Sequence, residues 1–163
     1  MSCSRSLFGP LLFALTYALV SLPLFALWEV AHAPLYTLWV ERGAEAGIKA
    51  ALHCTLGDAV IAFICALAGL LFGNVTPSLR TFARTIGLII IFGVLVTVGI
   101  ELISTRWLGR WAYRDAMPVD PFLGIGLSPL AQWLVVPAIS LQLLRDRLQQ
   151  ELSSVARAAM AIN

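Results

Sequence analysis

A glutamate and a histidine stand three residues apart, at Glu29 and His32, inside a long apolar stretch. On a helix this spacing puts both side chains on one face, where they can pair or share a ligand. Two copies of such a Glu-x-x-His step, with further glutamates, build di-iron sites in helical bundles. A later apolar stretch holds Glu101 and Ser104 at this spacing instead, so the sequence does not predict a dinuclear site.

The chain has two histidines, His32 and His53. Together with Glu29 they offer ligands for a single metal ion, and the two imidazoles alone would suit haem ligation. Neither cofactor is favoured, because ionisable groups in apolar stretches usually pair with one another. The competing interpretation is a buried Glu–His pair that locks neighbouring helices together. The sequence therefore does not identify a cofactor.

Asp58 and Glu101 each interrupt an otherwise uncharged stretch. In an apolar pocket such carboxyl groups can exchange protons with a bound molecule. The sequence therefore predicts Glu101, Asp58 and His53 as catalytic residues. The alternative is structural: Asp58 would hydrogen-bond a neighbour such as Gln132 or Trp133 and fix the helix packing.

The composition is 60% hydrophobic and 12% charged. Ordinary soluble domains carry about twice that charged fraction, and lipid accepts an apolar surface that water does not. The net charge of +2, without a cluster of Lys and Arg, argues against a nucleic-acid partner. The sequence therefore predicts an integral membrane protein surrounded by a lipid bilayer.

We expect an all-α integral membrane protein with one domain, residues 1–163, built as a four-transmembrane-helix bundle. The expected helices cover about residues 7–30, 50–73, 85–105 and 122–144, with short loops between them. Pro129 and Pro137 free backbone carbonyls in the fourth helix, so we expect this helix to be packed among the others. The residues after 144 should form a cytoplasmic helical tail, since they are rich in Ala, Leu, Gln and Arg.

The distribution of basic residues predicts the orientation in the membrane. With the N-terminus inside, six arginines lie on the cytoplasmic side and five basic residues lie outside. Because cytoplasmic loops carry the excess of Lys and Arg, we expect both termini in the cytoplasm, with the chain in a plasma (inner) membrane.

In four antiparallel helices, the end of the first and third and the start of the second and fourth share one side. Most polar and ionisable residues gather at these ends, whereas the other halves of the second and third helices are aliphatic. We therefore expect a polar site near the outer leaflet. The residues expected to bind a ligand there are Glu29, His32, Tyr113, Gln132 and Trp133.

Three functions remain open on these observations, and the sequence does not decide whether the protein is an enzyme. The first is a site that binds or transforms a small hydrophobic ligand, with a metal ion as an option. The second is a non-enzymatic accessory or assembly subunit that docks on a larger membrane protein. The third is an oligomeric transporter, because one four-helix protomer is small for a transport pathway.

Overall fold

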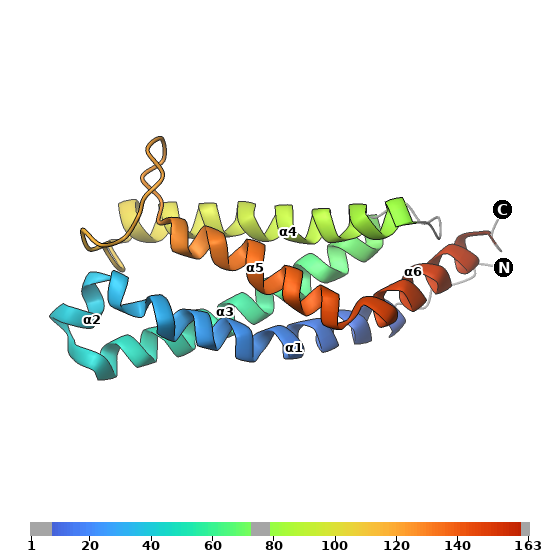
Figure 1. Ribbon diagram of the computed structural model, residues 1–163, viewed down its shortest axis with the longest axis horizontal. Coiled ribbons are helices and arrows are strands. Elements are labelled where there is room, and N and C mark those ends of the chain that lie inside the picture. Colours follow the sequence, from blue (N-terminus) through green and yellow to red (C-terminus); the bar gives the residue numbers. More distant parts are fainter. Residues whose placement is uncertain (1–7, 73–78, 161–163) are drawn as a thin grey trace.

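The computed structural model describes residues 8–72 and 79–160, which fold almost entirely into helices (Figure 1). The elements in chain order are α1 (Phe8–His32), η1 (Ala33–Leu35), α2 (Thr37–Glu41), α3 (Gly43–Phe72), α4 (Leu79–Leu102), η2 (Ile103–Trp107), α5 (Leu127–Leu143) and α6 (Arg145–Met160). The all-helical class predicted from the sequence is confirmed for these residues. The predicted helix ends at residues 7 and 73, and tail residues 161–163, lie outside the described residues.

Three helical segments are long and apolar enough to cross a membrane. They are Phe8–Leu35, Gly43–Phe72 and Ala83–Trp107. A fourth span exists only if α5 and the first part of α6 are counted together, and this pair is bent by 76° at the break between them. The structure therefore has three candidate spans, or four if the bent pair is one.

The core forms where small residues let the helices approach closely. α1 packs along α3, and α4 packs against both α3 and α5. Ala62 and Ala66 of α3 are fully buried, and Gly69 faces Ile89 of α4 with no room for a Cβ atom between them. Small residues at four-residue spacing give α3 a flat face on which its neighbours can pack.

The outward face of α3 is a continuous apolar stripe. Leu52, Leu56, Val60 and Ile64 follow one another at four-residue spacing, and each is more than half exposed. A water-soluble monomer rarely exposes such a surface, whereas lipid solvates it at no cost. The described exterior therefore suits an apolar surrounding.

Three predicted helix starts are wrong. α4 begins at Leu79 rather than at residue 85. The second long helix begins at Gly43 rather than at residue 50, and its extra first turns carry the exposed Glu45–Lys49 ion pair at 2.6 Å. The last predicted helix begins at Leu127 rather than at residue 122. There, Asp120 Oδ2 accepts hydrogen bonds from the backbone N–H groups of the residues two and three further on, which closes a turn in place of a helix.

The connection between η2 and α5, residues 108–126, is not the short loop that the sequence predicted. The helical tail was predicted and is present as α6. It is not a free tail, because Leu144, Leu148 and Leu152 are buried and α6 packs on α1, α4 and α5. The chain thus bends back onto the bundle at Leu144 instead of leaving it.

Candidate functional site

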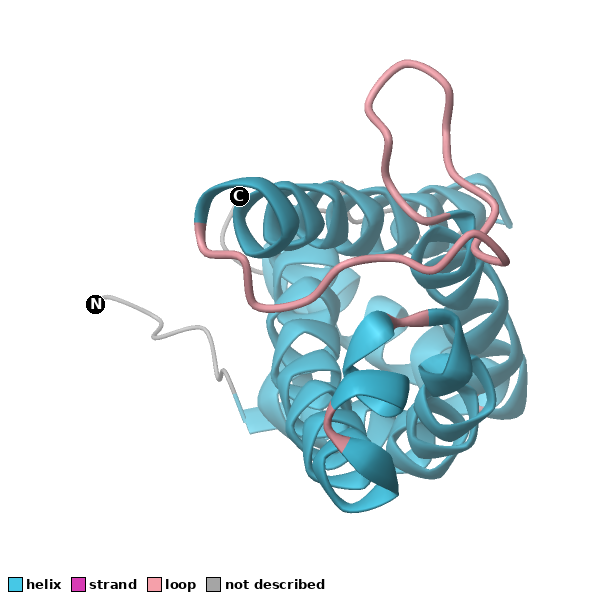
Figure 2. Cartoon of the chain, turned by 90° about the vertical axis from the view of Figure 1, so that its left-hand side faces the viewer, coloured by secondary structure: helices cyan, strands magenta, loops and turns pink. Residues whose placement is uncertain are grey.

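The helix ends that carry the polar residues lie at one end of the molecule, opposite the start of α1 and the end of α6 (Figure 1). Figure 2 looks onto this end and shows the connection between η2 and α5 running across it. The common end predicted from antiparallel packing is therefore present in the described residues. α1, α3, α4 and α5 each contribute a polar side chain to this end.

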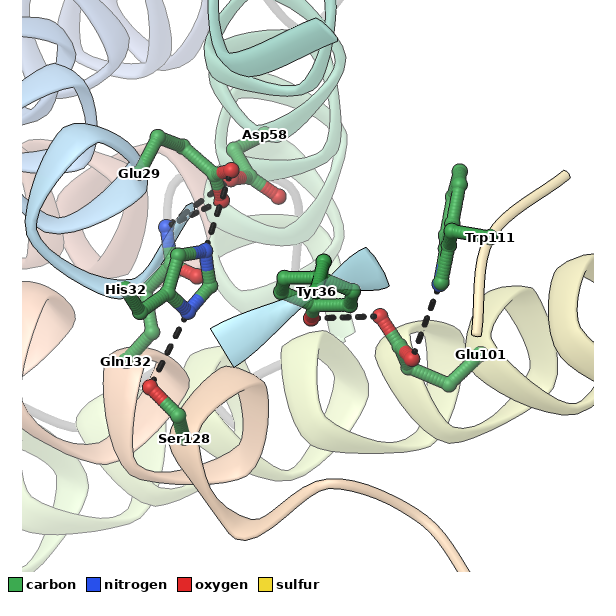
Figure 3. A network of polar contacts seen from close by, with 8 residues as sticks. All are labelled: Glu29, His32, Tyr36, Asp58, Glu101, Trp111, Ser128 and Gln132. Carbon is green, nitrogen blue, oxygen red and sulfur yellow. Dashed lines mark hydrogen bonds and ion pairs between the residues drawn. The ribbon is translucent and has the colours of Figure 1, made fainter. Parts of the chain in front are cut away.

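His32 is held on both sides of its ring. Its Nε2 lies 3.1 Å from Glu29 Oε2, and its Nδ1 lies 3.0 Å from the Ser128 hydroxyl of α5 (Figure 3). Glu29 and His32 are both buried. The geometry suits an imidazole that donates to the carboxylate from Nε2 and accepts from the serine hydroxyl. The pair predicted from the three-residue spacing is therefore formed, and it ties α1 to α5.

Gln132 of α5 links two carboxyl groups from two other helices. Its Nε2 donates to Glu29 Oε1 at 3.1 Å and to Asp58 Oδ2 at 3.0 Å (Figure 3). The amide is almost completely buried, at 2% exposure. An amide nitrogen has two hydrogens, so both donors are used and both are directed at carboxyl oxygens. Asp58 is therefore linked to Glu29 through Gln132, one of the two hydrogen-bond partners that the structural alternative predicted for it.

Glu101 of α4 forms a second cluster with three aromatic donors. Its Oε1 lies 3.5 Å from the Tyr36 hydroxyl, its Oε2 lies 3.4 Å from Trp111 Nε1, and Tyr113 donates a short hydrogen bond to the same Oε2. The three rings pack edge to face or tilted against one another. A buried carboxylate is costly unless donors surround it, and here all of the donors come from outside the long helices.

Backbone contacts fix the segment that supplies two of these donors. Thr37 N donates to Ala112 O at 2.9 Å, and Arg114 N donates to Leu35 O at the same distance. The Arg114 guanidinium also donates to Pro34 O at 2.8 Å. These bonds form a short antiparallel bridge between the end of α1 and the η2–α5 connection, and so hold Trp111 and Tyr113 over the end of the bundle.

The pKa values of both tyrosines are raised above the ordinary value. Burial raises the pKa of Tyr36, and the neighbouring Glu101 raises it further. Burial also raises the pKa of Tyr113, followed by its hydrogen bond to Glu101. Both phenols therefore keep their protons across the physiological range and remain donors to the carboxyl group.

A cavity of about 280 Å³ lies between the two clusters. A volume at the lower end of the range for small-molecule pockets is enough for a compact ligand. Its lining combines the carboxyl groups of Glu29, Asp58 and Glu101 with aromatic and aliphatic walls. Tyr36, Trp39, Ala51, Thr97, Trp111 and Gln132 also line the cavity.

Trp133 and Phe25 pack together beside Gly93, where Trp133 lines the cavity. The two rings lie 5.3 Å apart between centroids, and both side chains are fully buried. A Cβ atom at Gly93 of α4 would overlap the indole ring, so glycine leaves the room that this ring fills. The aromatic pair thus separates the cavity from the aliphatic core beyond it.

Thr97 of α4 also lines the cavity, and its hydroxyl has no hydrogen-bond partner among the described residues. The side chain is 7% exposed. A buried hydroxyl normally finds a partner, because an unpaired one costs about 1–3 kcal/mol. Thr97 therefore offers an unused polar contact to whatever occupies the cavity.

The predicted site residues fall into two hydrogen-bonded clusters and two separate positions. Glu29, His32, Asp58 and Gln132 form one connected network, and Tyr113 belongs to the Glu101 cluster. Trp133 lies at the buried side of the cavity. His53 lines the cavity rim from an exposed position on α3 and makes no hydrogen bond with the described residues.

The metal ligands suggested by the sequence, His32, His53 and Glu29, do not come together. Within residues 8–72 and 79–160, no three His, Cys, Asp or Glu side chains are placed to hold a metal ion. The physical reason is helix rotation: both nitrogens of His32 already face Glu29 and Ser128, whereas His53 lies on the exposed side of its helix.

Three residues of the site were not among the predicted site residues: Tyr36, Trp111 and Ser128. Tyrosine and tryptophan near helix ends are typical of the membrane–water interface, which hid their role as donors to Glu101. Ser128 precedes a proline in the first turn of α5, and nothing in its local pattern indicates a histidine partner from α1. Two of these contacts join residues far apart in the chain, 65 positions for Tyr36 and Glu101 and 96 for His32 and Ser128. The third joins Trp111 to Glu101, ten positions before it.

Comparison with known proteins gives no relative on which to base a function: no family model, curated protein or solved structure matches the chain.

Proposed function

We propose that this protein is an integral membrane protein with four spans, the fourth formed by α5 and the adjoining part of α6. Both termini would lie in the cytoplasm of a plasma membrane, and the cavity would open near the outer leaflet. Its function would be to bind a small, largely apolar molecule in that cavity. The apolar exterior of α3 and the three long apolar segments support the membrane location.

One observation carries the binding proposal: a cavity of about 280 Å³ coincides with the densest set of buried polar groups in the described residues. Pockets that bind small molecules combine apolar walls with a few fixed polar groups. Here, Glu29, Asp58 and Gln132 are fixed by mutual hydrogen bonds before any ligand arrives. Preorganisation of this kind lowers the entropic cost of binding.

The test is to fill the cavity without touching its polar groups. Ala51 of α3 lines the cavity and is buried, whereas its neighbour Leu52 is 58% exposed on the apolar stripe. We would purify wild type, Ala51→Trp and the control Leu52→Trp from the same membranes. Mass spectrometry of the organic extract would then quantify small molecules that are retained by the protein.

If the proposal is right, wild type and Leu52→Trp each retain about one equivalent of a single small molecule. Ala51→Trp should retain about tenfold less, because the indole ring removes most of the apolar contact in the pocket. Circular dichroism would check that the three proteins have the same helix content. Equal retention by Ala51→Trp and Leu52→Trp, or no retained molecule in wild type, would overturn the assignment of the cavity as the binding site.

A further inference from the structure

The polar groups around the cavity are dominated by acceptors. Glu29, Asp58 and Glu101 all line it, and the amide that bridges two of them, Gln132, has already used both hydrogens of its nitrogen. A carboxylate oxygen can accept more than one hydrogen bond, so accepting capacity remains. A ligand that brings hydrogen-bond donors would therefore be matched better than one that brings acceptors.

The basic groups near the cavity do not balance these acids. His32 is committed to Glu29 and Ser128, His53 is exposed and unpaired, and Arg110 lines only an exposed rim position. Charges at an exposed rim are screened by solvent, whereas the buried carboxyl groups are screened little. Among the described lining residues, the interior of the cavity thus holds three carboxyl groups and no basic side chain that is not already paired, a setting that favours a cation.

Aromatic rings supply the second requirement for a cation. Tyr36, Trp39 and Trp111 line the cavity together with the acids. The face of an aromatic ring attracts an ammonium group, and the attraction grows where water is excluded. Thr97 lines the same cavity, and its hydroxyl is buried without a hydrogen-bond partner among the described residues, so it retains the capacity to accept a hydrogen bond.

We propose that the cavity binds an amphipathic amine, with its ammonium group between Asp58, Glu29 and the Thr97 hydroxyl and its apolar body against the aromatic wall. This inference rests on the proposed function, because it specifies which class of small molecule the cavity takes. The ammonium group would accept no hydrogen bonds and would donate to carboxyl oxygens and to the threonine oxygen, which satisfies each of these groups.

The test uses three probes with one skeleton and three charges: 3-phenylpropylammonium, 3-phenylpropan-1-ol and 3-phenylpropanoate. Each would be titrated by calorimetry into wild type in nanodiscs of phosphatidylcholine, with empty nanodiscs as the control for partition into lipid. The variants are Asp58→Asn, which removes one carboxylate from the cavity, and Asp115→Asn, which removes one from an exposed loop position at the same end. Ala51→Trp reports on the cavity itself.

We expect the ammonium probe to bind about tenfold more tightly than the alcohol, and the carboxylate probe to bind least. Asp58→Asn should remove most of that preference by weakening binding of the ammonium probe more than binding of the alcohol, and Asp115→Asn should leave both affinities unchanged. Equal binding of the three probes, tighter binding of the carboxylate, or an unchanged preference in Asp58→Asn would overturn the amine assignment.

The two proposals fail in different ways. If the alcohol binds wild type and Ala51→Trp abolishes its binding, the cavity is a binding site even when the ammonium probe has no advantage. If none of the three probes binds wild type, or if Ala51→Trp leaves all three affinities unchanged, the proposed function itself fails. Circular dichroism and the elution volume of each variant would show that altered binding does not reflect unfolding.

Discussion

The two ends of the molecule are built on opposite principles. At the end where α1 and α6 meet, Phe13, Tyr17, Leu148 and Leu152 are buried in a mainly apolar core. At the other end, buried polar side chains surround a cavity of about 280 Å³. The first end is held by many small, non-directional contacts, and the second by a few directional hydrogen bonds.

This contrast indicates which end of the molecule loses more stability when one side chain is replaced. In a close-packed apolar core each atom–atom contact contributes little by itself, and the stability is spread over many of them. A buried polar network differs, since each removed acceptor leaves several donors unpaired in a place without water. A protein that keeps such a network around an open cavity gives up packing there, which is the usual condition of a binding site rather than of a stabilising core.

We expect the largest loss of stability at the polar end from Glu101→Ala. It removes the acceptor of three donors, Tyr36, Trp111 and Tyr113, and we expect a loss of about 3 kcal/mol of unfolding free energy. Denaturant unfolding in detergent, followed by circular dichroism, measures it. Limited proteolysis should at the same time show cleavage in residues 108–126.

The matched variant Glu101→Gln keeps one acceptor oxygen and a similar volume, so it should retain part of the stability and most of the resistance to protease. A loss below about 1 kcal/mol in Glu101→Ala would mean that the aromatic rings hold the connection by packing alone.

The second prediction concerns the bridge between Glu29 and Asp58. Gln132→Leu leaves both carboxyl groups without their shared donor, and we expect a loss of about 2 kcal/mol. Gln142→Leu is the control, since Gln142 is exposed on the same helix and should change stability by less than about 0.5 kcal/mol. Equal effects of the two variants, measured by the same unfolding experiment, would show that the bridge contributes nothing.

The third prediction probes the boundary between the two ends. Gly93→Ala introduces a Cβ atom where the Trp133 ring lies, so it should cost about 1–3 kcal/mol through overpacking. Gly87→Ala places the same atom in open space on the same helix and should be neutral or stabilising by up to about 1 kcal/mol. A similar loss in both variants would point to helix curvature rather than to contact with Trp133 as the reason for glycine.

Much of the architecture could be predicted because it follows from one-dimensional patterns. Uncharged stretches located the long helices, and the rule that antiparallel neighbours alternate direction placed the polar residues at one end. The residues at which the helices begin were harder to predict. Charged residues such as Glu45 and Lys49 end an apolar stretch without ending the helix, so α3 begins earlier than hydropathy indicates.

The site was predicted in part for a similar reason. The three-residue spacing of Glu29 and His32 is a local property of one helix, and the predicted pair is present. Gln132 was predicted as one possible partner of Asp58, but which partner is bonded depends on the rotation of α3 about its axis, which an apolar stretch of even hydropathy does not fix. Trp111 reaches Glu101 only through the long connection, whose path no local pattern encodes.

The final prediction concerns the pH dependence of stability above neutral pH, which depends on the two tyrosines that contact Glu101. The pKa values of Tyr36 and Tyr113 are raised above the ordinary 10.0, so above pH 10 the unfolded chain loses phenolic protons that the folded chain keeps. Ionisation of these two phenols should therefore leave the free energy of unfolding unchanged below about pH 9. It should lower that free energy as the pH rises above the pKa of a phenol in the unfolded chain.

Denaturant unfolding at pH 8 to 11 would compare wild type with the double variant Tyr36→Phe/Tyr113→Phe, which lacks both phenols. The variant should start less stable, because Glu101 loses two donors, and then decline less steeply with pH, because it has no such protons to retain. Parallel declines would mean that both phenols ionise alike in the folded and unfolded chain. The tyrosines would then be exposed to water at the end of the bundle, and the enclosed polar end would be no less solvated than an ordinary loop.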